Sequence, residues 1–172
     1  MAQHVRRIDR ILADGYTDGL DTHSVDELHA MEREALEVET EISYIRRLAQ
    51  GRIDILEAER DRRAAGGTLG DLIAKLPEIL ADGGPRSDAA HTRAQSVLAP
   101  AAGIEWNRGV ERLVSDATLV NLPTLSEAEL QATLSQLREL EHDLSGRRRA
   151  LHGVIDALTH ELAERLAANS PG

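Results

Sequence analysis

The sequence predicts an all-α protein in which two long helices form a coiled coil and are connected by a short helix and a partly ordered linker. Apolar residues recur at alternating steps of three and four along 24–64 and again along 126–168. Each of these segments opens with Ser-x-x-Glu, the signature of a helix capping box. Aromatic residues make up only 2% of the chain, which is typical of long helices rather than of a sheet-based core.

The first elements in chain order are an N-terminal arm and the first long helix. The arm, 1–23, contains a short amphipathic helix followed by turn-forming residues. The first coiled-coil helix, 24–64, ends where two glycines follow it. Its expected seam, interrupted only by Arg52, consists of Leu28, Met31, Ala35, Val38, Ile42, Ile45, Ala49 and Leu56.

The linker, 65–125, contains a short helix at 68–82. Thr68 can cap this helix, and Pro77 is expected to kink or split it. Its broad apolar face has two possible uses: contact with a partner, or docking onto the protein's own coil. The rest of the linker is small, polar and rich in alanine, so we expect it to be only partly ordered.

The second coiled-coil helix is predicted over 126–168, and a disordered tail over 169–172. One seam row falls at every seventh residue, namely Leu130, Leu137, Leu144, Leu151 and Leu158. A second expected row contains Leu140 and Val154 and is weakened at Thr133 and Arg147.

The two long helices carry the same five polar residues at the same spacing. Copy 1 of this motif is Glu39, Ser43, Arg46, Gln50 and Asp54. Copy 2 is Glu141, Ser145, Arg148, His152 and Asp156. Each position of copy 1 matches the residue 102 positions later, with histidine in place of glutamine at the fourth position. A coiled coil needs only an apolar seam, so a repeated polar pattern indicates a role outside the coil.

At roughly 100° per residue, the five positions of each copy fall within an arc of about 80°, off the expected seam. They form a polar stripe roughly 22 Å long near the middle of each helix. In an antiparallel pair both stripes lie on the same side of the coil, whereas in a parallel pair they lie on opposite sides. The long connection between the helices permits the antiparallel arrangement but does not require it.

The residue types in the stripes suit a ligand that contains guanine and phosphate. Arginine binds guanine through O6 and N7, and phosphate through its planar fork. Aspartate can accept hydrogen bonds from guanine N1 and N2, and serine can donate to a phosphate oxygen. The alternative is that these residues are ordinary solvent-exposed charges that do little.

With these residues the chain resembles the RsiG family of cyclic di-GMP-responsive anti-sigma factors. The hallmark of that family is the pattern E-x3-S-x2-R-x3-Q-x3-D on each helix of an antiparallel coiled coil. Copy 1 matches it at all five positions, and copy 2 departs from it only at His152. The resemblance therefore implies that the coil is antiparallel.

The resemblance also implies a ligand and a partner. The stripes would bind a dimer of cyclic di-GMP, hence two nucleotides per chain, as a regulatory ligand rather than a cofactor. The loaded protein would sequester a WhiG-type sigma factor and so control transcription in sporulation. The implied guanine contacts are Arg46, Arg148, Asp54 and Asp156. The implied phosphate contacts are Ser43 and Ser145, and the supporting residues are Glu39, Glu141 and Gln50. His152 can donate or accept as glutamine does, and it could make affinity sensitive to pH near neutrality.

Charge and hydropathy narrow the function classes. The net charge of −10 argues against direct nucleic-acid binding. It suits a partner with a basic face, or it simply keeps a helical protein soluble. No apolar run is long enough to span a membrane and no signal-peptide core follows Met1, so we expect a cytoplasmic location.

An enzyme is not expected. The chain contains no cysteine, no glycine-rich phosphate loop and no nucleophile elbow. Glu139 and His142 have the spacing of half a di-iron motif, but a second such pair is missing. The main alternative function is a coiled-coil adaptor or scaffold without a small ligand, which would leave the repeated stripe unexplained.

Overall fold

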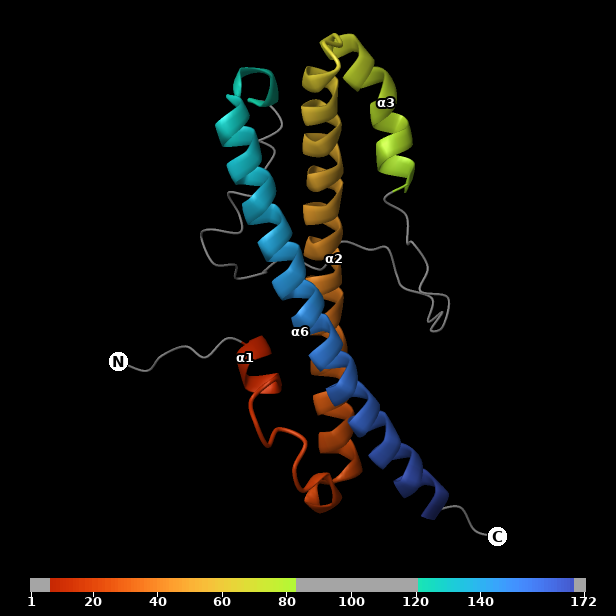
Figure 1. The fold of residues 1–172 in the computed structure, drawn as a ribbon. Coiled ribbons are helices and arrows are strands. Elements are labelled where there is room, and N and C mark those ends of the chain that lie inside the picture. Colours follow the sequence, from red (N-terminus) through yellow and green to blue (C-terminus); the bar gives the residue numbers. More distant parts are fainter. Residues whose placement is uncertain (1–6, 83–120, 169–172) are drawn as a thin grey trace. The chain divides into compact units, whose positions relative to one another are not determined.

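The computed structural model describes residues 7–82 and 121–168, which contain helices and no strand. The two long helices are α2, Val25–Ala64, and α6, Glu127–Ala168 (Figure 1). The shorter elements are α1 at Arg7–Ile11, η1 at Leu20–Thr22, α3 at Leu69–Asp82 and η2 at Leu122–Thr124. Most of the linker predicted to be partly ordered, 83–120 of 65–125, and the predicted disordered tail, 169–172, lie outside the described residues.

The chain divides into two compact units, and each unit contains part of both long helices. Unit 1 comprises Met1–Ser43 and Leu144–Gly172, and unit 2 comprises Tyr44–Asp143. In unit 1, Glu32 contacts Thr159 and Glu39 contacts Arg148, so later residues of α2 meet earlier residues of α6. Unit 2 shows the same order, because Arg46 contacts Glu141 and Arg63 approaches Glu127. The predicted antiparallel pairing of the two helices is thus confirmed within each unit.

Reciprocal hydrogen bonds between a serine and a glutamate cap the N-terminus of each long helix. The backbone N–H of Ser24 donates to the Glu27 carboxylate at 2.8 Å, and the Glu27 N–H donates to Ser24 Oγ at 3.3 Å. Ser126 and Glu129 repeat these two bonds at 2.8 and 3.3 Å. Both predicted capping boxes are therefore formed, and they satisfy backbone donors that the first helical turn leaves free.

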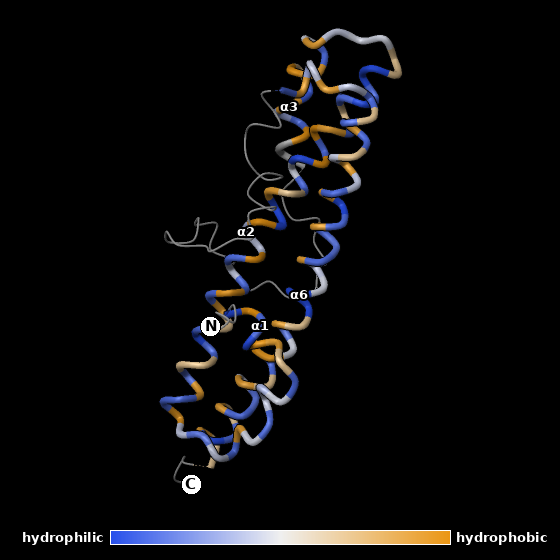
Figure 2. Tube along the Cα trace, turned by 90° about the vertical axis from the view of Figure 1, so that its left-hand side faces the viewer, coloured by the Kyte–Doolittle hydropathy of each residue, from blue (hydrophilic) through white to orange (hydrophobic). Residues whose placement is uncertain are grey.

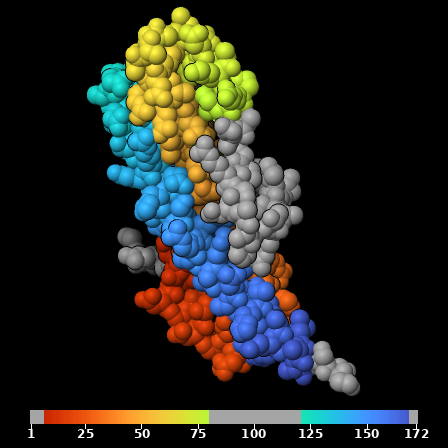
Figure 3. All heavy atoms as spheres, turned by 45° about the vertical axis from the view of Figure 1, so that its right-hand side comes forward, coloured from red at the N-terminus to blue at the C-terminus, as the bar shows by residue number. Residues whose placement is uncertain are grey.

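In unit 1, the N-terminal arm packs on the coil through two buried side chains, Ile11 and Leu20, and several ion pairs. Ile11 at the end of α1 is fully buried. Arg7 pairs with Glu37 of α2 at 2.7 Å, and Asp9 pairs with Arg147 of α6 at 3.3 Å. Figure 3 shows the N-terminal segment in red against α6 in blue. The buried cluster of this unit contains Leu20, Leu28, Leu158 and Leu162.

In unit 2, α3 docks on the coil through part of its apolar face. Leu72 is buried, whereas Ile73 on the same helix is 58% exposed. The helix continues through Pro77, so the expected split at this proline is absent. The buried cluster of this unit contains Ala49, Ile55, Leu56, Leu72, Leu122, Leu130, Leu134 and Leu137.

A buried carboxylate holds the two arginines at the end of α2, and one of them connects α2 to the segment that precedes α6 in unit 2. Glu59 is fully buried and accepts hydrogen bonds from Nε of Arg62 and Nε of Arg63, both at 2.6 Å. Arg63 also donates to the carbonyl oxygens of Leu125 and Leu122, at 2.7 and 2.9 Å. The hydrogen bond from Arg62 is the main reason that the pKa of Glu59 lies below its ordinary value.

The seam of α6 corrects one prediction. The row at every seventh residue, from Leu130 to Leu158, is buried as expected. The second row is not the predicted one, because Leu140 and Val154 are only partly buried. Its buried members are instead Leu134, Ile155 and Leu162. This rotation buries three large apolar side chains instead of two, and it leaves Thr133 and Arg147 out of the core.

Both long helices are amphipathic, with apolar residues at the buried seam positions. Figure 2 shows hydrophobic and hydrophilic positions alternating along both α2 and α6. In α2 the predicted seam is buried except at Met31, which is partly exposed. Arg52 interrupts this seam as predicted and is itself buried.

Candidate functional site

The ten motif residues are divided between the two units. We call the members in unit 1 half-site 1, namely Glu39, Ser43, Ser145, Arg148, His152 and Asp156. The members in unit 2 form half-site 2, namely Arg46, Gln50, Asp54 and Glu141. Each half-site therefore contains residues of both motif copies, because the helices are antiparallel.

Half-site 1 is organised around one carboxylate oxygen of Glu39. This Oε1 accepts a hydrogen bond from Ser43 Oγ at 2.7 Å and another from Arg148 Nε at 2.9 Å. His152 Nε2 lies 3.3 Å from the same oxygen. The side chain of Glu39 is only 12% exposed. Glu39 thus holds a serine of its own helix and two basic side chains of the facing helix.

The surroundings of Glu39 favour its charged form. Burial raises the pKa of Glu39, but the hydrogen bonds from Ser43, Arg148 and His152 together outweigh burial and leave the pKa below its ordinary value. The carboxylate is therefore ionised at neutral pH and forms a charge-assisted hydrogen bond with Arg148. As a result, the guanidinium of Arg148 is held in place before any ligand arrives.

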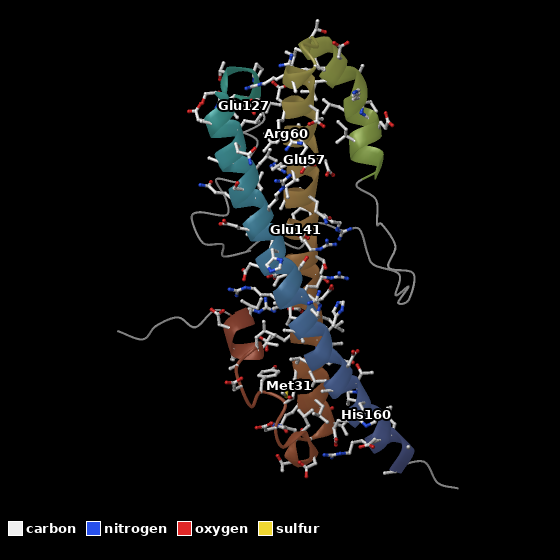
Figure 4. The ribbon with its side chains drawn as sticks, viewed as in Figure 1. Met31, Glu57, Arg60, Glu127, Glu141 and His160 are labelled. Atoms are coloured by element: carbon white, nitrogen blue, oxygen red, sulfur yellow. The ribbon has the colours of Figure 1, made fainter. Side chains whose placement is uncertain are left out.

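Half-site 2 has the same arrangement with the helices exchanged. Oε1 of Glu141, labelled on α6 beside α2 in Figure 4, lies 3.4 Å from an Nη of Arg46 and 3.5 Å from Nε2 of Gln50. These contacts are longer than those in half-site 1, and the Glu141 side chain is 24% exposed. Nε of Arg46 is shielded from solvent and has no hydrogen-bond partner among the described residues. Arg46 therefore keeps a donor that a ligand atom could satisfy.

The two half-sites are reciprocal. In each, the glutamate of one motif copy faces the arginine and the fourth residue of the other copy. His152 occupies in half-site 1 the role that Gln50 has in half-site 2. The single departure from the repeated pattern therefore preserves a hydrogen-bonding side chain at this point.

The remaining motif residues differ in exposure, and two members of copy 2 differ from prediction in their position on the helix. Asp54 and Ser145 are partly buried, whereas Asp156 is exposed. Glu141 and Arg148 occupy steps of the buried row that starts at Leu134, so the prediction that the whole motif lies off the seam is wrong for them.

Two polar contacts that the sequence analysis missed extend the half-sites. Thr159 Oγ1 donates to Glu32 at 2.8 Å in unit 1, and Arg138 donates to Glu57 in unit 2. Glu32 lies seven residues before Glu39 and therefore on the same face of α2. Extending the motif by one heptad on α2 would have identified this residue.

A metal site and a membrane-spanning helix are both absent from the described part of the chain. Residues 7–82 and 121–168 contain no group of three or more histidine or acidic side chains placed to hold a metal ion. In the same ranges no helix combines the length and apolar character needed to cross a membrane.

Comparison with known proteins agrees with this geometry. A family model described as RsiG-like matches residues 14–80 and 116–171, which include both motif copies and more than half of the chain. The curated proteins gave no match. The family match indicates an anti-sigma factor, which is a regulator with a sigma factor as its partner. The chain belongs to the RsiG-like family.

Proposed function

We propose that this protein is a cyclic di-GMP-dependent anti-sigma factor. In the loaded state it would bind two molecules of cyclic di-GMP per chain and sequester a WhiG-type sigma factor. A fall in the nucleotide level would release the sigma factor to transcribe its genes, which the family resemblance connects with sporulation. The protein would act in the cytoplasm, where its partner works.

The observation that carries this proposal is the reciprocal placement of Arg46 and Arg148. Each guanidinium lies beside a glutamate of the facing helix, Glu141 and Glu39 respectively. A guanine O6 and N7, or a phosphodiester oxygen, presents the same kind of acceptor to an arginine fork as a carboxylate does. A guanine nucleotide can therefore take over contacts for which both arginines are already positioned.

Each half-site draws its residues from both long helices, and this suggests how a ligand would act on the coil. In half-site 1 the acceptor belongs to α2 and the basic groups to α6, and in half-site 2 these origins are exchanged. A ligand bound to either half-site would contact both helices. It would favour the helix arrangement that it binds best, and through this differential affinity the sigma-binding form.

The first test is calorimetric titration with cyclic di-GMP of the intact protein and of the Arg46→Ala/Arg148→Ala variant. We expect binding near two nucleotides per chain for the intact protein and loss of binding in the variant. An Arg46→Lys/Arg148→Lys variant keeps both charges but lacks the planar fork, so its binding should be strongly weakened as well.

The matched control is Arg33→Ala, which removes a positive charge from an exposed position of α2 outside both half-sites. This control should bind as the intact protein does, and all variants should keep their helix content by circular dichroism. If the intact protein binds no nucleotide, either alone or with a WhiG-type sigma factor, the proposal fails and a coiled-coil adaptor becomes the better description.

A further inference from the structure

The two half-sites differ at one titratable position. Gln50, which cannot change its charge, lies beside Glu141 in half-site 2. His152 lies beside Glu39 in half-site 1 with its Nε2 at 3.3 Å, and its side chain is 46% exposed. Histidine is the side chain whose charge changes between about pH 5 and pH 8. Only half-site 1 therefore contains a group that can gain a positive charge near neutral pH.

We propose that His152 makes ligand binding at half-site 1 proton-dependent, so that the protein binds cyclic di-GMP more tightly as the pH falls below neutrality. This inference rests on the proposed function, because the nucleotide is the ligand considered. It identifies His152 as a residue that determines affinity, not as a neutral replacement for glutamine.

The described charged groups around His152 define the charge of half-site 1. Glu39 faces it from α2. On α6 itself, Arg148 and Asp156 lie one turn away on either side, and Arg149 lies three residues before it. The ion pair that α1 makes with α6 involves Arg147, which points about 140° away from His152 around the helix.

Protonation of His152 raises the affinity of half-site 1 for an anion. Glu39 and Arg148 compensate each other, and Arg149 and Asp156 carry opposite charges, so these four groups add no net charge while His152 is neutral. A protonated His152 makes the group positive and adds an N–H donor. Each phosphodiester of cyclic di-GMP is anionic, and it is therefore bound better by the protonated form. Because the imidazole is half exposed, water and salt screen the effect, and we expect about a fivefold change in affinity.

Linkage sets the sign of the pH dependence. A ligand that prefers the protonated form promotes proton uptake on binding, so the Kd rises with pH through the range in which histidine loses its proton. Glu39 does not produce this trend, because its pKa lies below its ordinary value and it stays ionised over the whole range.

The experiment compares the intact protein with His152→Gln and Gln50→His, each titrated calorimetrically with cyclic di-GMP at about pH 6 and about pH 8. The first variant gives half-site 1 the residue of half-site 2, and the second does the reverse. We expect the intact protein to bind about fivefold more tightly at the lower pH. The His152→Gln variant should show little pH dependence, and Gln50→His a larger dependence than the intact protein.

A second readout is proton uptake, measured at about pH 7 in buffers of different ionisation enthalpy. The intact protein should take up protons on binding, whereas His152→Gln should not. If nucleotide binding has the same pH dependence in the intact protein and in His152→Gln, this inference is overturned and the proposed function stands. If no variant binds nucleotide at either pH, both are overturned.

Discussion

Copy 1 of the motif lies beside the buried seam of α2, whereas copy 2 lies partly within the buried seam of α6. In α2, the seam positions next to the motif glutamate and arginine are filled by Val38 and Ile45, which are both buried. In α6, Glu141 and Arg148 themselves occupy steps of the row that begins at Leu134. The duplication thus fixes the spacing along each helix, but the apolar residues available to each helix decide how it is rotated.

The half-sites also differ in how firmly they are formed. Glu39 is the more buried glutamate, and Ser43 and Arg148 donate to it at 2.7 and 2.9 Å. Glu141 is the more exposed one and lies 3.4 Å from Arg46. The contacts of Glu39 are therefore shorter and more buried than the contact between Glu141 and Arg46, and in half-site 2 the Nε of Arg46 remains as a donor for a ligand.

The largest expected effect tests the rotation of α6. Leu134→Ala removes a fully buried side chain and should lower the free energy of unfolding by about 2–5 kcal/mol. Leu140→Ala changes a residue of the predicted second seam row. It should lower the free energy of unfolding clearly less than Leu134→Ala, because Leu140 is only partly buried. Urea unfolding of both variants measures the difference. Equal losses would mean that the two rows contribute equally and that the copies are not rotated differently.

The limits of sequence-based prediction follow from this rotation. The caps at Ser24 and Ser126 could be predicted because they depend on residues three positions apart, and the coil because its periodicity is local. Leu137 can belong to a row with Leu134 or to one with Leu140, and both steps suit a heptad. Only the packing of the facing helix decides between them, and this information is not local.

The same reasoning applies to the candidate site. The spacing identified all ten polar residues, but it could not show that Glu39 and Glu141 each face the arginine of the other copy. It also missed the buried carboxylate of Glu59, which sits where an apolar seam residue is expected. Two adjacent arginines, Arg62 and Arg63, make this burial possible, and such compensation is visible only in three dimensions.

The next effect tests the difference in contact length and burial between the two glutamates. Glu39→Ala leaves Arg148 and the buried Ser43 without this acceptor, and it should lower the free energy of unfolding by about 1–3 kcal/mol. Glu141→Ala removes the longer contacts to Arg46 and Gln50 at a more exposed position and should cost less than about 1 kcal/mol. Thermal and urea unfolding provide the measurement. A greater loss in Glu141→Ala than in Glu39→Ala would reverse our ranking of the half-sites.

A third comparison uses two glutamates of α2 whose pKa values shift in opposite directions. The pKa of Glu39 is lowered, so its ionised form stabilises the folded state above the unfolded pKa, and this stability is lost as the pH falls through the folded pKa. Burial raises the pKa of Glu41; Arg7 opposes this shift and Glu37 adds to it. The ionised form of Glu41 therefore destabilises the folded state at neutral pH, and stability is gained as the pH falls through its raised pKa.

The matching variants are Glu39→Gln and Glu41→Gln. At neutral pH the first should be less stable than the intact protein and the second more stable. The Glu41 difference should shrink as the pH falls through the raised pKa of this residue, whereas the Glu39 difference should shrink only at lower pH, as the pH falls through its lowered pKa. Unfolding curves recorded across this range check the signs. Shifts of the same sign in the two variants would show that burial and hydrogen bonding do not separate these residues as described.

The smallest expected effect concerns a glycine that both copies share. Gly51 follows Gln50, and Gly153 follows His152, at the same offset as the rest of the motif. Both lie inside helices, and a Cβ added at either position meets no atom within 4 Å among the described residues. Replacement by alanine should therefore stabilise the protein by about 0.5–1 kcal/mol at each position.

Gly146 provides the matched control. A Cβ added there also meets no atom within 4 Å, but the equivalent position of α2 is occupied by Tyr44 rather than by glycine. All three alanine variants should raise the unfolding midpoint to a similar extent. If Gly51→Ala and Gly153→Ala also weaken nucleotide binding while Gly146→Ala does not, the shared glycine keeps space for the ligand beside the fourth motif residue. If the three variants bind alike, the glycines matter only for helix stability, and the repeated function is confined to the five polar positions.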